Sequence, residues 1–103
     1  MPKNPLGGLM VPAVSTFHAD GSIDRASFSA NIDSHLAHGV DGVLVAGSSG
    51  ESALLDDDDR RQLLTLARAR VPADRWLHAG VGSESTRQTI ARARDAHASG
   101  ADD

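Results

Sequence analysis

Two adjacent serines stand between two glycines in the segment Gly47-Ser48-Ser49-Gly50, which Glu51 follows. The glycines let the backbone turn sharply, and two hydroxyls beside successive N–H groups can converge on an anion. The segment comes directly after the apolar run 43–46 and before a helical pattern. At the carboxyl end of a parallel strand, such a loop is typical of a site for a small carboxylate or phosphate.

Other polar residues give weaker signals. His35 and His38 lie three residues apart and could share a helix face like metal ligands, but no carboxylate has a matching spacing. The run Asp56 to Asp59 lacks the alternation, central glycine and distal glutamate of a calcium loop, so it indicates a solvated helix start. Gly80-Val81-Gly82 lacks the third glycine of a dinucleotide motif. The sequence therefore predicts no metal and no cofactor.

The composition of the 103 residues excludes several functions. A net charge of −4 argues against nucleic-acid binding, which needs a basic face. The chain has no cysteine, so it forms no disulfide and no thiolate metal site. No apolar stretch is long enough to span a membrane, and residues 1–5 lack the apolar part of a signal peptide. We expect a soluble, cytoplasmic protein.

Three strands and three helices alternate along the chain. The apolar runs predict strands at 9–14, 42–46 and 76–81, and the periodic segments predict helices after Asp24, over 56–70 and after Ser85. A strand–helix repeat of roughly 30 residues is typical of a parallel α/β sheet. Strand 42–46 is continuously apolar, as expected when both faces are covered.

The helices carry capping and packing signals. Asp24 is the expected N-cap of the first helix, with a hydrophobic staple between Ile23 and Phe28, and Gly39 is the expected residue after its end. Ser85 and Gln88 have the spacing of a capping box. The residues expected to face the core are Phe28, Ile32 and Leu36 in the first helix, Leu63, Leu66 and Ala67 in the second, and Ile90, Ala93 and Ala96 or His97 in the third.

One junction occurs twice. Gly39-Val40-Asp41-Gly42 leads from the first helix into the second strand, and Gly100-Ala101-Asp102-Asp103 repeats it after the third helix, where the sequence ends. We therefore expect residues 1–103 to be the opening portion of a longer α/β protein.

These motifs, in this order, resemble the dihydrodipicolinate synthase / N-acetylneuraminate lyase family of class I pyruvate-type aldolases. Its typical loop is Gly-Thr-Thr-Gly-Glu, matched here by residues 47–51. Segments 14–17, 20–24, 79–86 and 100–102 match in register as well. The resemblance implies an α/β fold consisting of the first three βα units of an incomplete (β/α)8 barrel, with residues 1–103 the N-terminal portion of one barrel domain cut before its fourth strand.

The resemblance also implies a chemistry. A lysine of the family forms a Schiff base with pyruvate or another 2-oxo acid, and a tyrosine transfers protons while carbon–carbon bonds form or break. By resemblance, Ser48, Ser49 and Gly50 bind the substrate, and Ser48 is also the proton-relay hydroxyl. The only lysine here is Lys3, which lacks the desolvation that activates a nucleophile, and the chain has no tyrosine. We expect a substrate half-site within a lyase whose full-length parent is a homo-oligomer.

The sequence departs from the family pattern at several positions. Thr-Pro-Phe is replaced by residues 15–17, and Glu84 stands at an asparagine of the lysine effector site. Asp57 and Arg60 replace histidines found in some members, which argues against lysine regulation. We expect Glu51 to accept backbone hydrogen bonds. The alternative hypotheses are a non-catalytic anion-binding or assembly fragment, and a truncated product without a stable fold.

Overall fold

The computed structural model describes residues 7–103, so Lys3 lies outside the described residues. The elements in chain order are β1 (Met10–Pro12), α1 (Arg25–Ala37), β2 (Gly42–Val45), the 3-10 turns η1 (Ser48–Gly50) and η2 (Ser52–Leu54), α2 (Asp57–Arg70), β3 (Trp76–Ala79) and α3 (Thr86–Ala98). Strand and helix alternate three times, as the sequence predicts.

The three strands form one parallel sheet in the order β1-β2-β3. Each strand is shorter than its apolar run. β1 ends at Pro12, and the amide of Ala13 makes one further bond to β2, to Leu44 O (2.9 Å). Ala46 has φ 58°, which is incompatible with a strand and ends β2 at Val45.

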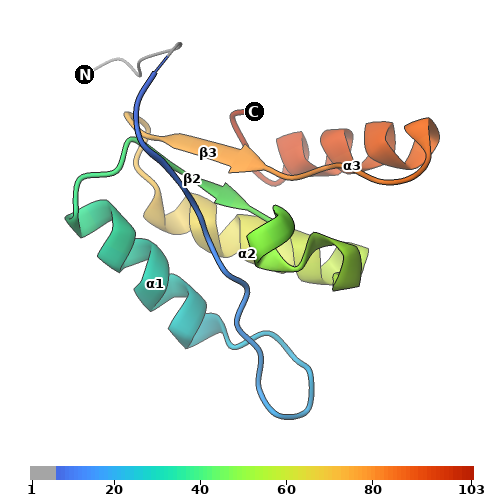
Figure 1. Ribbon diagram of the computed structural model, residues 1–103, viewed down its shortest axis with the longest axis horizontal. Coiled ribbons are helices and arrows are strands. Elements are labelled where there is room, and N and C mark those ends of the chain that lie inside the picture. The colour runs from blue at the N-terminus through green and yellow to red at the C-terminus, as the bar shows by residue number, and fades with distance from the viewer. Residues whose placement is uncertain (1–6) are drawn as a thin grey trace.

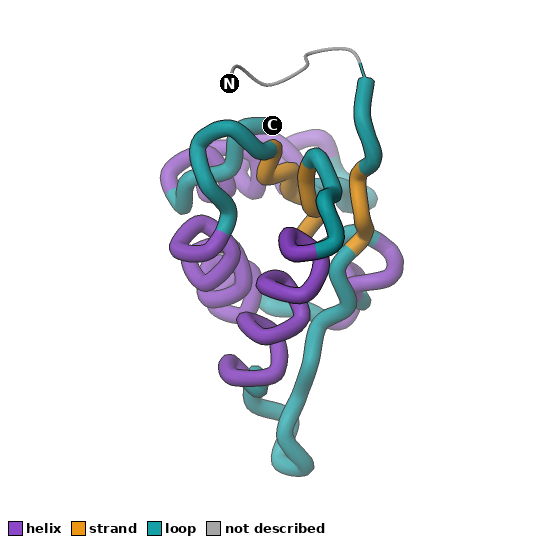
Figure 2. The backbone as a smooth tube through the Cα atoms, turned by 90° about the vertical axis from the view of Figure 1, so that its left-hand side faces the viewer, coloured by secondary structure: helices purple, strands orange, loops and turns teal. Residues whose placement is uncertain are grey.

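The helices form a single layer against the sheet. α1 packs on α2 and α2 on α3, while α2 also contacts both β2 and β3. Figure 1 shows α2 behind the strands, with α1 and α3 on either side of it, and Figure 2 shows the strands grouped beside the helices. The three units therefore advance in one direction, as successive right-handed βα crossovers do.

α1 begins and ends as expected. The Asp24 carboxylate accepts from the Ser27 amide (3.1 Å), and Gly39 follows the helix with φ +85°. The staple residues Ile23 and Phe28 are both buried. Short-range patterns in the sequence therefore predict where this helix begins and ends.

α2 is the central helix of the layer. Its N-cap is Asp56, whose carboxylate accepts from the Asp59 amide (2.8 Å), while the Asp59 carboxylate accepts from the Asp56 amide (3.3 Å). The predicted core residues Leu63 and Ala67 are fully buried, whereas Leu66 is only partly buried. The acidic run thus caps a helix, as expected.

α3 differs from its prediction. Ser85 caps it as expected, but its own amide donates to Ser83 Oγ (3.2 Å), so the predicted capping box is wrong. Ile90 is 47% exposed and Ala93 is exposed, so the predicted inner face is wrong at these two positions and confirmed at Ala96. Only Ala96 is buried, because α3 touches the layer along one side of α2 and nothing in residues 7–103 covers the Ile90 side.

The sheet is covered fully on one face only. Val43 and Val45 lie under the helices and are buried, whereas Leu44 and its neighbour His78 are half-buried on the opposite face. The expectation that both faces of β2 are covered is therefore wrong for residues 7–103. The His78 ring stacks on Trp76 with centroids 5.6 Å apart, which packs this polar residue on the open face.

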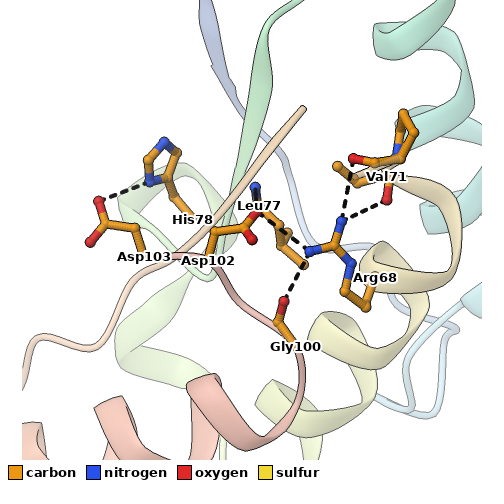
Figure 3. A network of polar contacts seen from close by, with 8 residues as sticks. Arg68, Val71, Leu77, His78, Gly100, Asp102 and Asp103 are labelled. Atoms are coloured by element: carbon orange, nitrogen blue, oxygen red, sulfur yellow. Dashed lines mark hydrogen bonds and ion pairs between the residues drawn. The ribbon is translucent and has the colours of Figure 1, made fainter. Parts of the chain in front are cut away.

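The repeated junction has the same hydrogen bonds twice. The Asp41 amide donates to Leu9 O (2.8 Å), while Asp41 Oδ2 accepts from the Leu9 amide (2.7 Å). After α3, the Asp102 amide donates to Leu77 O (2.8 Å), and Asp102 Oδ2 accepts from the Leu77 amide (3.0 Å). Each aspartate thus closes a ring with the neighbouring strand, and residues 102–103 lie along β3 (Figure 3).

Arg68 braces the second of these junctions. It donates to Gly100 O (3.0 Å) and Val71 O (2.7 Å), and its guanidinium lies 3.4 Å from Asp102 Oδ2 (Figure 3). The carbonyls at the end of α2 and the segment after α3 are thereby held by one cation. None of the helices in residues 7–103 is both long and apolar enough to cross a membrane.

Candidate functional site

The serine loop lies at the carboxyl end of the central strand. Ala46 turns the chain out of β2 with φ 58°, and η1 starts at Ser48. The turn passes so close to β3 that a Cβ on Gly80 would lie 2.1 Å from Ala46 O. A glycine at position 80 therefore permits the close approach of the two strand ends.

The loop leaves two consecutive backbone donors open. Within it, the Gly50 amide donates to Gly47 O (3.0 Å) and the Glu51 amide to Ser48 O (3.1 Å). The amides and hydroxyls of Ser48 and Ser49 make no hydrogen bond with any residue in 7–103, and both serines are exposed. Two N–H groups and two hydroxyls of consecutive residues are thus left without a partner in residues 7–103.

The residues after β1 support the serine loop through contacts with Gly50. Ser15 Oγ donates to Gly50 O (2.7 Å), and a Cβ on Gly50 would lie 3.1 Å from Ala13 O. Gly50 is buried in this contact, while the two serines beside it face solvent. The hydroxyl of Ser15 thus ties the serine loop to the segment after β1.

Arg60 holds the loop from the α2 side. It is only 6% exposed, and its guanidinium donates to Gly80 O (3.0 Å), to Ser52 O and to Ser52 Oγ (3.0 Å). Burial lowers the pKa of Arg60, and the charge of Arg92 lowers it further. The residue after β3 and the η2 turn are therefore joined by a cation.

Sequence reasoning noted Arg60 only as a departure from the family and missed this role. A signal was present, because Arg60 lies on the buried stripe of α2 at the i, i+3, i+4, i+7 spacing with Leu63, Leu64 and Ala67. An arginine in such a stripe buries its stem and sends its guanidinium to buried acceptors.

An open groove runs beside the loop toward the third βα turn. Ser48, Ser52 and Glu51 line one side, and the segment 82–84 lines the other. Arg92 closes one end and donates to Gly82 O (2.7 Å). Arg92 is therefore half-buried, whereas Arg87 and Arg94 on the same helix are exposed.

Glu51 differs from its prediction. Its residue is exposed, has φ 60°, and its carboxylate accepts no hydrogen bond from residues 7–103. The left-handed backbone links η1 to η2 and points this residue outward, so the expected backbone hydrogen bonds to it are wrong.

The histidines do not form a metal site. His38 is the C-cap of α1, and its Nδ1 lies 2.7 Å from Ser34 O. No group of three or more His, Cys, Asp or Glu residues in 7–103 has an arrangement that could hold a metal ion. The site therefore consists of the serine loop and its supports.

The fold and the loop define a parallel α/β segment with anion-accepting groups at the carboxyl end of its central strand. The sequence model of the dihydrodipicolinate synthetase family matches residues 5–103, and the chain belongs to this family. This is a family of class I aldolases, which are lyases.

Curated relatives and solved structures agree with this assignment. The 4-hydroxy-tetrahydrodipicolinate synthase of a Synechococcus strain is 40% identical over 99 residues, covering 95% of this chain and 32% of its own. A prophage protein of the same family from E. coli, YagE, solved in complex with pyruvate, superposes with a TM-score of 0.88 at 31% identity, covering 96% of this chain and 33% of its own. Dihydrodipicolinate synthase from Agrobacterium tumefaciens superposes with a TM-score of 0.86 at 35% identity. The match covers 92% of this chain and 32% of that protein.

The chain spans about a third of the length of these relatives. The predicted fold class, three βα units of the family's (β/α)8 barrel with an open sheet, is confirmed by these superpositions.

Proposed function

We propose that this chain supplies the carboxylate-binding part of a Schiff-base-forming lyase or synthase that acts on pyruvate or another 2-oxo acid. The observation that carries the proposal is the pair of open amides and hydroxyls at Ser48 and Ser49, at the carboxyl end of β2. A carboxylate accepts such donors in charge-assisted hydrogen bonds. The curated relatives are named 4-hydroxy-tetrahydrodipicolinate synthase, which supports the same reaction class for the parent.

Each loop residue has a role in the proposal. Ser49 binds the substrate carboxylate through its hydroxyl and amide, and Ser48 binds it and relays a proton through its hydroxyl. Gly50 keeps the loop in the shape that binds substrate, since its own amide is engaged by Gly47 O. The lysine nucleophile and the proton-transferring tyrosine belong to later strands of a single barrel domain that begins with residues 1–103. We propose a cytoplasmic, homo-oligomeric parent.

Fusion to the remaining units of a relative tests the proposal. We expect residues 1–103, joined to the complementary two-thirds of the Synechococcus synthase, to form a pyruvate adduct that borohydride traps on a lysine outside this chain. Mass spectrometry of the peptides locates the adduct. The chain alone should give no adduct, and trapping on Lys3 would contradict the assigned division of roles.

The serines are tested in the same fusion. Ser49→Ala should raise the pyruvate concentration for half-maximal trapping by roughly 10-fold or more, because a hydrogen bond to a charged group is lost. Ser34→Ala, an exposed serine on α1, is the matched control and should change nothing. Equal trapping by both variants counts against a carboxylate site in the loop.

A second function, assembly without catalysis, is favoured by one observation. The β1 edge away from β2 has no strand partner in residues 7–103, and the nearby side chains of Leu9 and Val14 are exposed. An uncovered strand edge can recruit another chain. Sedimentation of the chain distinguishes the two: a discrete oligomer that binds phosphate but gives an inactive fusion favours assembly.

A further inference from the structure

Arg60 lies behind the groove that borders the serine loop. Its side chain is buried and faces the space between α2 and α3. Its acceptors, however, belong to Ser52 and Gly80, and both of these residues line the groove. Arg60 therefore acts on the groove through its walls.

One arm of the guanidinium holds the end of the serine loop. Arg60 Nη2 donates to Ser52 O and to Ser52 Oγ (3.0 Å). The Ser52 amide in turn donates to Gly47 O (3.2 Å), which also accepts from the Gly50 amide (3.0 Å). Gly47 and Ser52 stand on either side of the segment that carries the open donors. This arm thus connects Arg60 to both ends of that segment.

The other arm holds the residue that follows β3. Arg60 Nη1 donates to Gly80 O (3.0 Å), and the Gly80 amide donates to Val45 O (2.8 Å) at the end of β2. Gly80 also lies directly against Ala46, the residue before the serine loop begins. The two arms therefore reach the backbone that enters the loop and the backbone that leaves it.

These contacts require the shape of an arginine side chain. A guanidinium is planar and donates from separate nitrogens in fixed directions, whereas a lysine ammonium is a single compact point of donation. Both Arg60 arms end on oxygens that cannot move independently of the backbone, Ser52 O and Gly80 O. The guanidinium thereby sets the separation of these two carbonyl groups.

We propose that Arg60 is a positioning residue for the serine loop, which raises the affinity of the loop for a carboxylate by holding Ser52 and Gly80 at a fixed separation. The inference rests on the proposed function, because it concerns the same loop. Binding by several donors at once requires that each is held in place by its surroundings, so a loosened support weakens binding even where every donor is still present.

Titration of the chain with sodium pyruvate tests this role. The amide NMR signals of Ser48 and Ser49 give the dissociation constant, with sodium chloride at equal ionic strength as the reference. Arg60→Lys keeps the charge but can serve only one arm, so we expect the dissociation constant to rise roughly 10-fold. Arg61→Lys, at an exposed arginine of the same helix, is the matched control and should bind as the unaltered chain does. Because the signals come from folded molecules, a loss of stability alone does not change this constant.

Ser52→Ala is the second variant and decides the question if Arg60→Lys does not fold. It removes one acceptor of Arg60 and should raise the dissociation constant by roughly 3-fold. Binding as tight as that of the unaltered chain, in Arg60→Lys or in its place Ser52→Ala, would overturn the positioning role alone. If pyruvate shifts neither serine amide of the unaltered chain, the proposed function fails and this inference fails with it.

Discussion

Gly80 lets two chain segments meet directly beneath the serine loop. The position of its missing Cβ would fall on backbone atoms of Ala46, which cannot move aside as the tip of a flexible side chain can. Ala46 is itself in the left-handed region, where a residue with a Cβ costs free energy. The strained backbone at Ala46 and the glycine at position 80 thus lie at the same contact, where the segments after β2 and β3 meet.

A methyl group at position 80 should therefore destabilise the fold. We expect Gly80→Ala to lower the free energy of unfolding by roughly 1–3 kcal/mol, because the backbone must shift to relieve the overlap. Gly82→Ala is the matched control, since a Cβ there has nothing within 4 Å. Urea unfolding of both variants provides the measurement, and equal losses would mean that the crossing is not tight.

Single residues were the hardest to predict from the sequence. The position of Ser48 and Ser49 directly after β2 could be predicted, because glycines flank them at the end of an apolar run. The burial of Arg60 could not be predicted from its residue type, because arginine side chains are usually exposed to solvent. Its role depends on the carbonyl of Gly80, twenty residues away, and only the fold brings that acceptor near.

At the scale of elements, the α1 N-terminus combines a cap with a titratable group. Hydrogen bonds from the Ser27 hydroxyl (2.7 Å) and then the Ser27 amide lower the pKa of Asp24. A carboxyl group with a depressed folded-state pKa stabilises the fold above its unfolded pKa. That contribution is lost as the pH falls through the folded pKa.

Removing the hydroxyl should weaken this acid sensitivity. In Ser27→Ala we expect the pKa of Asp24 to rise toward its ordinary value, because the largest cause of its depression is lost. Titration of the Asp24 carboxyl carbon by NMR measures the shift. Ser34→Ala, on the same helix with an exposed side chain, should leave the pKa of Asp24 unchanged.

Caps and core stripes were predictable to different extents. Asp24, Asp56 and Ser85 cap their helices through bonds spanning three residues, which short sequence patterns encode. The buried face of α3 could not be predicted in the same way. Its apolar residues occur on more than one side, and the neighbours present decide which side is covered, so Ile90 is exposed and Ala96 is buried.

At the scale of the whole molecule, the Asp41 ring joins the start of β2 to the residue before β1, and the Asp102 ring joins residues 102–103 to β3. Asp41 also accepts from the Trp76 amide through its carbonyl (2.9 Å), so one residue touches the starts of both β1 and β3. The sequence shows that the junction occurs twice. It does not show that the aspartate in each copy supplies both a hydrogen-bond donor and an acceptor.

Loss of the Asp102 carboxylate should open the outer edge of β3. We expect Asp102→Ala to speed hydrogen exchange of the Leu77 amide by roughly 10-fold, since its acceptor is removed. Asp102→Asn keeps an acceptor oxygen and should exchange nearly as slowly as the unaltered chain. Fast exchange of the Leu77 amide in Asp102→Asn would show that the negative charge of Asp102, which also pairs with Arg68, matters more than the hydrogen bond.

The Asp41 ring has a consequence for how the sheet grows during synthesis. It is completed by the residue made directly before β2, and its partner Leu9 belongs to the earlier segment that leads into β1. Pairing errors by one residue would misplace the carboxylate at once, before later segments exist. The register of β2 on β1 is thus tested as soon as β2 is made, before β3 exists.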